Sequence, residues 1–360
     1  MTERFEWIDF SRGLLMALVF VYHSEVYYYH DHSYSWMFTP FFLTGFFFVS
    51  GFLFSKDIQN VSIKSKVKQI FRGLLIPYLI FESLLFIPKI LTGRGSAYQL
   101  LGDVLLFRGS WFIIAIGVMQ LLYAIVLRVS PTKISLILSS ILFFVLGTEL
   151  CSIYFVDSAF YNKVLASPIL FSADLPNRMP FCLNLALFNC PFFGGGIFCS
   201  LYRNRFVSMC EKKYMFLLSL MGYISLYCVI DHFFIGSYWT GATGAYHNLP
   251  LMIIYSILGI WMTCSLSVLV KKIHPINYIG KYSIVFAFVN GACLTIASLL
   301  MNKLENVDAS NYFNQLTVAL IALILAWVVT ALINKFFPIM RGEKESFNKI
   351  SEKIGVSISW

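Results

Sequence analysis

A cationic side chain and a proton-accepting side chain near the N-terminus are spaced so that both can lie on one face of a helix and act on one ligand. Arg12 and His23 are eleven residues apart in a mostly apolar stretch. Eleven residues at 3.6 per turn come within about 20° of three full turns, so both side chains lie on one helix face, about 16 Å apart along the axis. An imidazole can take a proton from a hydroxyl as a general base, and a guanidinium can bind a phosphate through a bidentate fork. The pair therefore predicts proton abstraction at one end of a groove and anion binding at the other.

The composition indicates that this helix lies in a membrane. The 360 residues are 58% apolar and only 12% charged, against about 25% charged in soluble globular proteins. So little polar side chain cannot cover a folded surface in water, whereas a bilayer accepts apolar surface. An ionisable group at the bilayer centre costs about 2.5–3.5 kcal/mol, so Arg12 and His23 each require a partner or a task. For His23 the structural alternative is packing against a neighbouring hydroxyl.

The apolar segments predict an all-α, polytopic membrane protein. A spanning helix needs about 20 mostly apolar residues, and ten such runs are separated by polar or Gly- and Pro-containing breaks. We expect helices at residues 8–29, 36–55, 73–92, 110–128, 134–155, 181–201, 214–235, 249–270, 281–301 and 312–337. They form one integral membrane domain, residues 1–337, followed by a cytoplasmic tail, residues 338–360.

The basic residues predict that both termini are cytoplasmic. An even number of spans puts the two ends on one side, and Lys and Arg are enriched in cytoplasmic loops. With the N-terminus inside, all but six of the 27 basic residues are inside as well. The six outside are Lys89, Arg94, Arg108, Lys163, Arg178 and Lys303. The net charge of +9 therefore reflects topology and gives no reason to expect nucleic acid as a partner.

Three polar segments lie between the predicted spans, after them or at the outer end of one. In the tail, Phe347, Ile350, Ile354 and Ile358 recur at spacings of three and four, which is typical of a helix on the inner leaflet; a frayed tail is the alternative. His30, Asp31 and His32 could ligate a metal, but no second ligand pair accompanies them, so we favour a solvated loop and expect no metal. Asp231 and His232 either position an acceptor or simply end a helix.

The first predicted helix resembles the opening of a known family. Arg12, ten intervening residues and His23 are similar to the first-helix signature of the acyltransferase-3 family of integral membrane acyltransferases, and residues 7–13 fit its start. Further segments resemble that family in the same order along the chain. They are Pro40–Phe42, the aromatic run 45–53 that contains Ser50 and Gly51, residues 72–78 at the entry to the third helix, Ser110–Ile113 and Phe192–Gly196.

One position departs from the family pattern. Residues 279–283 read Ile-Gly-Lys-Tyr-Ser, as the family often does near its ninth helix, but Asn290 stands where the family often has a histidine. If that histidine helps to bind the acceptor, this chain binds its acceptor differently, and Asn290 is a candidate contact. The short outer segments resemble the compact branch that includes sugar O-acetylases.

The resemblance implies transfer of an acetyl group from cytoplasmic acetyl-CoA to a sugar hydroxyl of an envelope polysaccharide or lipid-linked glycan. A thioester is already activated, so no bound cofactor is needed; the protein must hold the donor's phosphates, take a proton from the hydroxyl and stabilise an oxyanion. His23 and Arg12 are the expected catalytic pair, with His23 as the base or as a transient acyl carrier. Arg12 and Arg72 are candidates for the phosphates. Lys68 is a weaker one, with Lys64 and Lys66, because these lysines can also be topogenic.

The remaining candidates also have ordinary structural alternatives. Ser50 and Gly51 would let the donor's chain pass close to the backbone, or they allow close helix packing. Trp111 would line the site or stack on the acceptor sugar, or it belongs to the aromatic belt at the membrane surface. Glu82 is a further candidate for contact with the acceptor.

Two other classes of function remain as alternatives to an enzyme of the cytoplasmic (inner) membrane. A transporter or flippase of a lipid-linked glycan would line its path with intramembrane charges, although the chain has no internal repeat of fixed period to support an inverted-repeat transporter. A sensor or scaffold is the third class. Acetyl-CoA, a glycan acceptor and membrane lipid are the expected partners, and the sequence specifies no oligomeric state.

Overall fold

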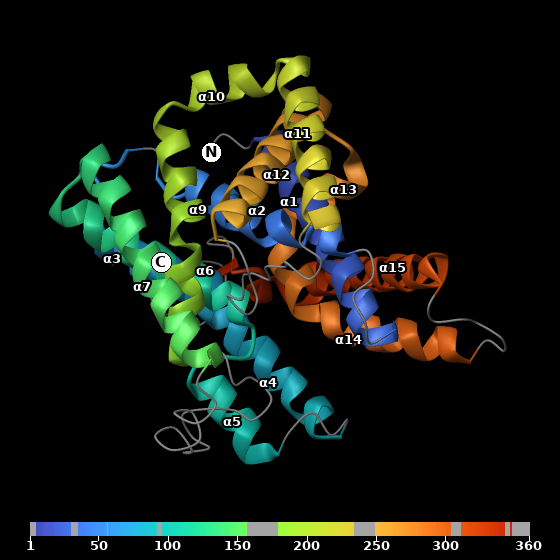
Figure 1. Ribbon diagram of the computed structural model, residues 1–360. Helices are drawn as coiled ribbons and strands as arrows, with labels where there is room; N and C mark the ends of the chain where they lie inside the picture. The colour runs from blue at the N-terminus through green and yellow to red at the C-terminus, as the bar shows by residue number, and fades with distance from the viewer. Residues whose placement is uncertain are drawn as a thin grey trace. The chain divides into compact units, whose positions relative to one another are not determined.

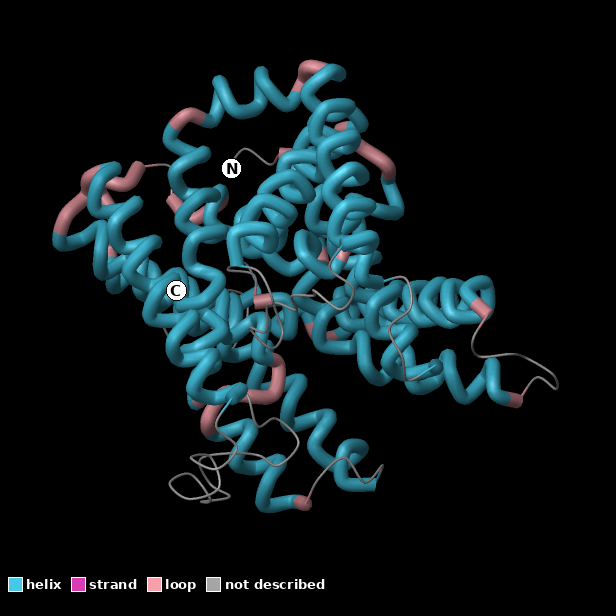
Figure 2. The backbone as a smooth tube through the Cα atoms, in the orientation of Figure 1, coloured by secondary structure: helices cyan, strands magenta, loops and turns pink. Residues whose placement is uncertain are grey.

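All regular elements of the described chain are helical. The computed structural model describes residues 5–29, 35–55, 57–91, 96–156, 179–233, 249–303, 311–342 and 346–347, and Figures 1 and 2 show helices joined by short loops throughout these ranges. Seven helices among them are long and apolar enough to cross a membrane, and two shorter ones, Thr39–Phe52 and Lys213–Val229, are apolar. The chain is therefore an all-helical, polytopic membrane protein, as the sequence predicts; the count of ten spans and the sides of the termini stay predictions.

Each of the ten expected segments coincides with a helix. These are α1 (Glu6–Ser24) with the π-helix η1 (Glu25–Tyr29), α2 (Thr39–Phe52), α4 (Ile76–Leu91), α6 (Trp111–Val129), α7 (Lys133–Val156), α9 (Leu183–Leu201), α11 (Lys213–Phe233), α12 (Leu249–Val270), α14 (Ser283–Asn302) and α15 (Tyr312–Phe336). The third begins earlier than expected, because α3 (Ile63–Ile70) and the π-helix η3 (Phe71–Leu75) run directly into α4. Ser62 caps this longer helix by accepting the Ser65 N–H at 3.3 Å, and the lysines of α3 lower the apolar signal that marks a span.

The described residues divide into two compact units. The first comprises the described parts of Met1–Val49, Tyr202–Thr240 and Tyr246–Phe336. The second comprises those of Ser50–Leu201 and Phe337–Trp360. Arg12, His23 and Asn290 belong to the first unit, and the other predicted site residues belong to the second: Ser50, Gly51, Lys68, Arg72, Glu82 and Trp111.

In the first unit α1 is the central helix. It packs against α12, α14, α15 and the short helix α13 (His274–Lys281), while α11 pairs with α12 and α14 with α15 (Figure 1). Glycines allow α1 and α13 to touch backbone to backbone. A Cβ on Gly13 would lie on the carbonyl of Ile276, and a Cβ on Gly280 would lie on the carbonyl of Asp9. The helix that carries Arg12 and His23 is thus held by contacts that tolerate no side chain.

The second unit is built around α6, α7 and α9. A Cβ on Gly51 would lie on the carbonyl of Phe193, so the end of α2 contacts α9 directly. Tyr123 of α6 donates to the carbonyl of Cys190 at 2.9 Å and bonds Ser140 of α7 at 2.7 Å, which ties the three helices together. Close packing, the structural alternative for Gly51, is therefore what the structure shows; passage of the donor beside it stays a prediction.

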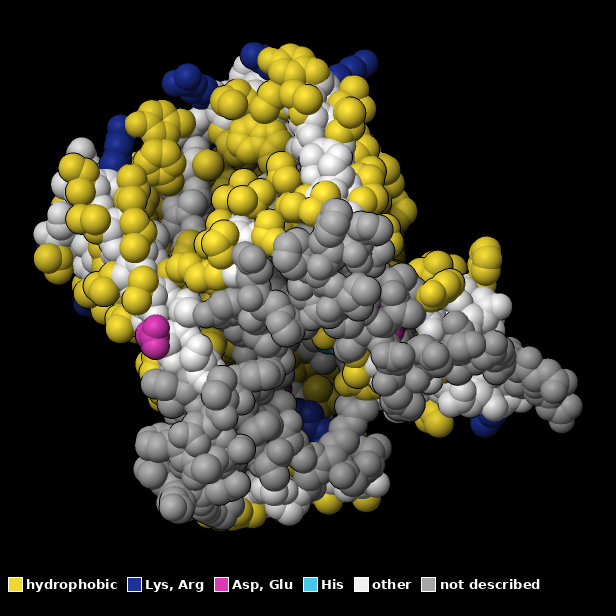
Figure 3. All heavy atoms as spheres, viewed as in Figure 1, with side chains coloured by type: hydrophobic (Ala, Val, Ile, Leu, Met, Phe, Trp, Pro, Cys, Tyr) yellow, Lys and Arg dark blue, Asp and Glu magenta, His cyan; other side chains and the backbone are white. Residues whose placement is uncertain are grey.

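On the surface of the first unit, apolar and basic side chains occupy separate regions, as expected of a membrane protein. Figure 3 shows hydrophobic side chains over the flanks of α11 and α12, and Lys and Arg side chains at the edge around α10 (Arg203–Cys210). On α11 the exposed apolar side chains include Leu218 (61%) and Met221 (64%). So much exposed apolar surface requires a non-aqueous surrounding. The basic turn between α10 and α11 fits the end of that apolar belt.

The structure describes only part of the three polar segments that the sequence singled out. Phe347 is only 4% exposed, and a helix of the tail on the inner leaflet stays a prediction. Ile350, Ile354 and Ile358, like His30, Asp31 and His32, lie outside the described residues. Asp231 and His232 lie in the last turn of α11, and their side chains are outside the described part as well.

The contact between α1 and α13 generates a stability prediction. Gly280→Ala should force α1 and α13 apart, because its Cβ would occupy the position of the Asp9 carbonyl; overpacking of this kind costs about 1–3 kcal/mol. Gly222→Ala is the matched control, since its Cβ would meet only Leu258 side-chain atoms, at 3.5 Å and beyond. We expect a lower midpoint of thermal unfolding in detergent for Gly280→Ala alone. Equal midpoints for the two variants would contradict the contact.

Candidate active site

His23 is hydrogen-bonded to Asn290 inside the first unit. Nδ1 of His23 lies 2.7 Å from Oδ1 of Asn290, a residue 267 positions away in the chain. His23 is half-buried, whereas Asn290 on α14 is only 4% exposed. The residue that the sequence assigned to the acceptor is thus in direct contact with the proposed base.

Aromatic packing holds the two helices in this register. One turn before His23 and Asn290, Phe20 and Phe286 meet edge to face at 6.2 Å. The imidazole itself lies between rings of its own helix, 5.3 Å from Tyr22 and 6.3 Å from Tyr27. Packed side chains in rotamer minima leave little freedom, so the orientation of the imidazole is fixed by its surroundings and not only by one hydrogen bond.

The contact with Asn290 has a chemical consequence for His23. An amide oxygen is only an acceptor, so Nδ1 must carry the proton that this bond uses. A neutral imidazole with its proton on Nδ1 has an unprotonated Nε2, which is the atom that can accept a proton from a hydroxyl. Asn290 also has an unused hydrogen-bond donor, because its buried Nδ2 has no hydrogen-bond partner among the described residues.

Arg12 lies on the same uninterrupted helix as His23, as the spacing predicts. It is half-buried and is next to Gly13, where α1 crosses α13. The N-terminal end of α1 is held at this crossing by Lys272, which pairs with Glu6 at 2.6 Å, and by Asn277, whose Nδ2 donates to the Glu6 carbonyl at 2.8 Å. Arg12 therefore lies at a well-anchored end of the helix.

Next along the chain, Glu25 opens η1 directly after α1. Its side chain is fully buried and accepts from Ser35, at 3.1 Å from the backbone N–H and at 2.6 Å from the hydroxyl. These bonds tie Ser35 to Glu25, directly after the helix that carries His23, so they stabilise that end of the helix.

In the second unit Glu82 is the buried member of an ion pair with the partly exposed Lys89. Its carboxylate, 3% exposed, accepts from Lys89 Nζ at 2.5 Å and from the hydroxyl of Ser110 at 2.6 Å. Gly109 makes room for it, since a Cβ there would be 2.7 Å from Oε1. Both carboxylate oxygens thus have donors within the protein, and a contact of Glu82 with the acceptor stays a prediction.

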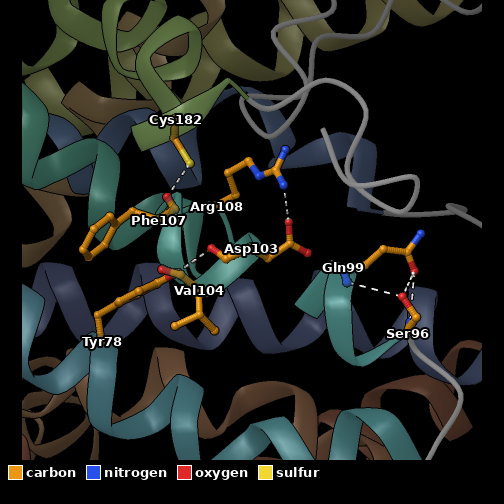
Figure 4. Close-up of polar contacts among 8 residues, drawn as sticks. All are labelled: Tyr78, Ser96, Gln99, Asp103, Val104, Phe107, Arg108 and Cys182. Carbon is orange, nitrogen blue, oxygen red and sulfur yellow. Dashed lines mark hydrogen bonds and ion pairs between the residues drawn. The ribbon is translucent and has the colours of Figure 1, made fainter. Parts of the chain in front are cut away.

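Beside it lies a second ion pair, between Arg108 and Asp103, which Figure 4 shows with its neighbours. Nη2 of Arg108 is 3.0 Å from Oδ1 of Asp103, and the Arg108 side chain is completely buried. Tyr78 donates to the Asp103 carbonyl at 3.1 Å, so α4 is tied to the end of α5 (Ala97–Leu105). The sequence predicted Arg108 to be one of six basic residues on the outer side of the membrane. It did not predict that Arg108 pairs with Asp103.

The backbone around Arg108 is unusual. Phe107, Phe181 and Cys182 all have positive φ, at 54°, 60° and 51°. The rings of Phe107 and Phe181 stack at 5.4 Å, and the Phe181 N–H donates to the Leu106 carbonyl at 2.8 Å. Non-glycine residues in this region are strained by about 1–3 kcal/mol each and persist only where the surroundings enforce them. The junction that begins α6 is therefore tightly determined.

The other predicted donor and acceptor residues belong to the second unit as well. Arg72 lies in the π-helix η3, half-buried, and its buried Nε has no hydrogen-bond partner among the described residues. Lys68 is half-buried on α3, one turn earlier. Ser50, near the end of α2, is half-buried. Trp111, also half-buried, begins α6 and contacts Phe112 edge to face at 6.0 Å.

The structure thus brings together two of the predicted site residues, His23 and Asn290, and places Arg12 on the helix that carries the first. What sequence reasoning missed is that Asn290 contacts the imidazole. The available signal was the Asn at a family histidine position seven residues after Ser283, but nothing in the spacing said which side chain it would meet.

Comparison with known proteins gives one match. A model of a family described as an acyltransferase domain matches residues 5–335, nearly the full chain. The search of curated proteins and of solved structures finds no match.

The buried carboxylate of Glu82 generates a second stability prediction. Glu82→Ala should leave Lys89 and Ser110 without their acceptor, and loss of a hydrogen-bonded charge costs about 1–3 kcal/mol. Glu149→Ala on α7 is the control, because it removes an exposed carboxylate of the same unit. Thermal unfolding in detergent should show a lower midpoint for Glu82→Ala than for Glu149→Ala. If both variants have the same unfolding midpoint as the wild type, the ion pair does not stabilise this unit.

Proposed function

Because the chain belongs to the acyltransferase-3 family of integral membrane acyltransferases, we propose that it transfers an acetyl group from cytoplasmic acetyl-CoA to a sugar hydroxyl of a cell-envelope polysaccharide or lipid-linked glycan. Its proposed place is the cytoplasmic (inner) membrane, crossed ten times with both termini inside. Membership in the family shows that the chain is an acyltransferase. The donor, the acceptor, the membrane and the topology are what we propose.

The hydrogen bond between His23 and Asn290 is the observation that supports the proposed mechanism. With Nδ1–H directed to Asn290, Nε2 of His23 takes the proton of the sugar hydroxyl. The oxygen attacks the thioester carbonyl, the new ester C–O bond forms and the C–S bond breaks. The proton then passes from Nε2 to the leaving thiolate, which departs as coenzyme A.

The two ends of α1 correspond to the two substrates in this proposal. Arg12 lies at the end that the basic residues assign to the cytoplasm, where the phosphates of the donor enter, and Arg72 with Lys68 is the second cationic site for them. His23 is about 16 Å further along the helix, toward the outer side where the glycan is. In this arrangement Asn290 Nδ2 is a further donor for the acceptor hydroxyl, and Trp111 and Glu82 stay the other proposed contacts of the acceptor.

Substitution of the catalytic pair is the direct test. His23→Ala should lower acetyl transfer by about 10²–10⁴-fold, the contribution of a positioned general base, and Arg12→Ala should weaken use of the donor. The measurement is mass analysis of surface glycans from cells with each variant, together with the amount of protein in the membrane. Normal acetylation with His23→Ala would overturn the assignment. Loss of exported glycan with unchanged acetyl content per repeat would identify a transporter.

Substitution of Asn290 tests the orienting hydrogen bond. Asn290→Leu removes the acceptor for Nδ1, so the wrong tautomer becomes available and kcat should fall at least about tenfold. Asn290→Asp keeps an acceptor oxygen and should retain more activity than the Leu variant. Ser298→Ala, a buried polar residue two turns further along α14, is the control and should leave kcat unchanged. Equal activities for Asn290→Leu and wild type would exclude this role.

A further inference from the structure

Two hydrogen bonds join Glu25, two residues after His23, to a single residue of the following segment. The Glu25 side chain is completely buried, and Ser35 is only 1% exposed. Oε1 of Glu25 accepts the Ser35 backbone N–H at 3.1 Å, and Oε2 accepts the Ser35 hydroxyl at 2.6 Å. A hydrogen bond to an ionised carboxylate is about twice as strong as one between neutral groups. The two residues therefore form a bidentate contact, which we call the Glu25–Ser35 clasp.

On one side the clasp holds a turn that packs against the imidazole. Glu25 is the first residue of the π-helix η1. Turns of this kind are rare and occur mostly at functional sites, so contacts outside the helix are needed to keep one. Tyr27 lies within η1, and its ring meets the His23 imidazole edge to face at 6.3 Å. Loss of the clasp would therefore release the ring that borders the proposed base.

On the other side the clasp holds the entry to α2. Ser35 is the first residue of the 3₁₀-helix η2 (Ser35–Met37), which leads into α2. On α2 the ring of Phe42 packs against Tyr22 at 5.5 Å, and Tyr22 is itself 5.3 Å from the imidazole. Both rings that contact the imidazole are thus connected to the clasp, one through η1 and the other through α2.

The rest of the first unit fixes the position of η2 and α2 independently of Glu25. The carbonyl of Met37 accepts the hydroxyl of Tyr223, whose ring stacks on Tyr255 at 4.2 Å. The hydroxyl of Ser256 donates to the carbonyl of Pro40 at 2.6 Å. Because these bonds anchor the start of α2 to α11 and α12, the clasp gives the turn after His23 a fixed position within the unit.

Stability alone does not require a carboxylate at this position. Transfer of an ionised carboxylate out of water is costly even when it is hydrogen-bonded, and neutral hydroxyls such as that of Ser256 anchor the same part of α2 without this cost. What a carboxylate adds is a two-point contact, which restricts direction as well as distance. Restriction of direction is what a positioned base requires.

We propose that Glu25 is a positioning residue of this acyltransferase, which through the clasp with Ser35 fixes η1 and so the direction in which the His23 imidazole points. The inference rests on the proposed function, because it gives Glu25 this task only where His23 is the base. Asn290 orients the imidazole through its Nδ1, and the clasp orients it through the turn that follows. Glu25 acts through His23 and needs no contact with either substrate.

Substitution of Glu25 tests the proposal through kcat and KM. Glu25→Ala should lower kcat about tenfold, because a small displacement of a catalytic group misaligns proton transfer. The KM for acetyl-CoA should stay unchanged, since the donor's phosphates bind near Arg12 at the other end of α1. Glu25→Gln should retain most of kcat, because its amide offers Ser35 an acceptor and a donor. The measurement is transfer of radiolabelled acetyl groups in membrane vesicles that contain the host's glycan.

Ser256→Ala is the matched control for these kinetics. It removes a buried hydrogen bond at the start of α2 without touching η1, so kcat should equal that of the wild type. A loss in Ser256→Ala as large as in Glu25→Ala would reduce the clasp to ordinary packing and overturn the proposal. The same holds if Glu25→Gln is as inactive as Glu25→Ala.

A double-mutant cycle shows whether Glu25 acts through His23. In the His23→Ala background, Glu25→Ala should cause no further loss, because no imidazole is left to position. For the same reason, Glu25→Ala combined with Ser35→Ala should lose no more than either single variant. A full additional loss in the His23→Ala background would show that Glu25 acts elsewhere.

The reactivity of His23 toward diethyl pyrocarbonate, followed by peptide mass analysis of the purified full chain, separates this inference from the proposed function. The reagent acylates an unprotonated imidazole nitrogen, so a released ring should react several times faster in Glu25→Ala, whereas Glu25→Gln and Ser256→Ala should match the wild type. If these rates are found but the wild type transfers no acetyl group, the clasp positions His23 and the proposed function is wrong. If the wild type transfers acetyl groups and Glu25→Ala matches it in rate and kcat, only the positioning role is overturned.

Discussion

The constraint on which this structure depends is that a polar group inside a bilayer must find its partner within the protein. In the predicted spans His23 bonds Asn290, and Glu82 bonds Lys89 and Ser110; the buried Arg108, just before a predicted span, pairs with Asp103. The first contact joins α1 to α14 and the Ser110 bond joins α4 to the start of α6, whereas Lys89 lies on the same helix as Glu82. The groups that make the segments costly to insert are therefore the groups that hold them in register.

Glycine makes these pairs possible by bringing backbones together. Gly13 and Gly280 let the backbones of α1 and α13 touch, and Gly51 lets the end of α2 touch the backbone of α9. Association of helices in lipid has no hydrophobic driving force between them, so close van der Waals contact takes its place. Because α1 is anchored in this way, the imidazole and the guanidinium that it carries have defined positions, which is what a positioned base and an anion site require.

The same reasoning connects the proposed chemistry to the C-terminal segment. A thioester donor supplies the activation, so the protein's contribution is to hold phosphates, orient one base and keep the two substrates aligned. Asn290 orients the base through one hydrogen bond, and Gly342 brings the C-terminal segment into backbone contact with the helix that carries Arg72. In both cases an uncharged residue determines where a neighbouring side chain or segment lies.

Much of this molecule follows from local sequence. Apolar runs of about 20 residues have no stable alternative to a membrane helix, so all ten expected segments coincide with helices, and the spacing of Arg12 and His23 puts them on one of these. Contacts between distant segments do not follow, because helical periodicity says which residues share a face but not which helix that face meets. The partner of His23 at position 290 and the neighbour of Arg72 at position 342 were decided by packing, where complementary glycines, rings and buried amides select one arrangement.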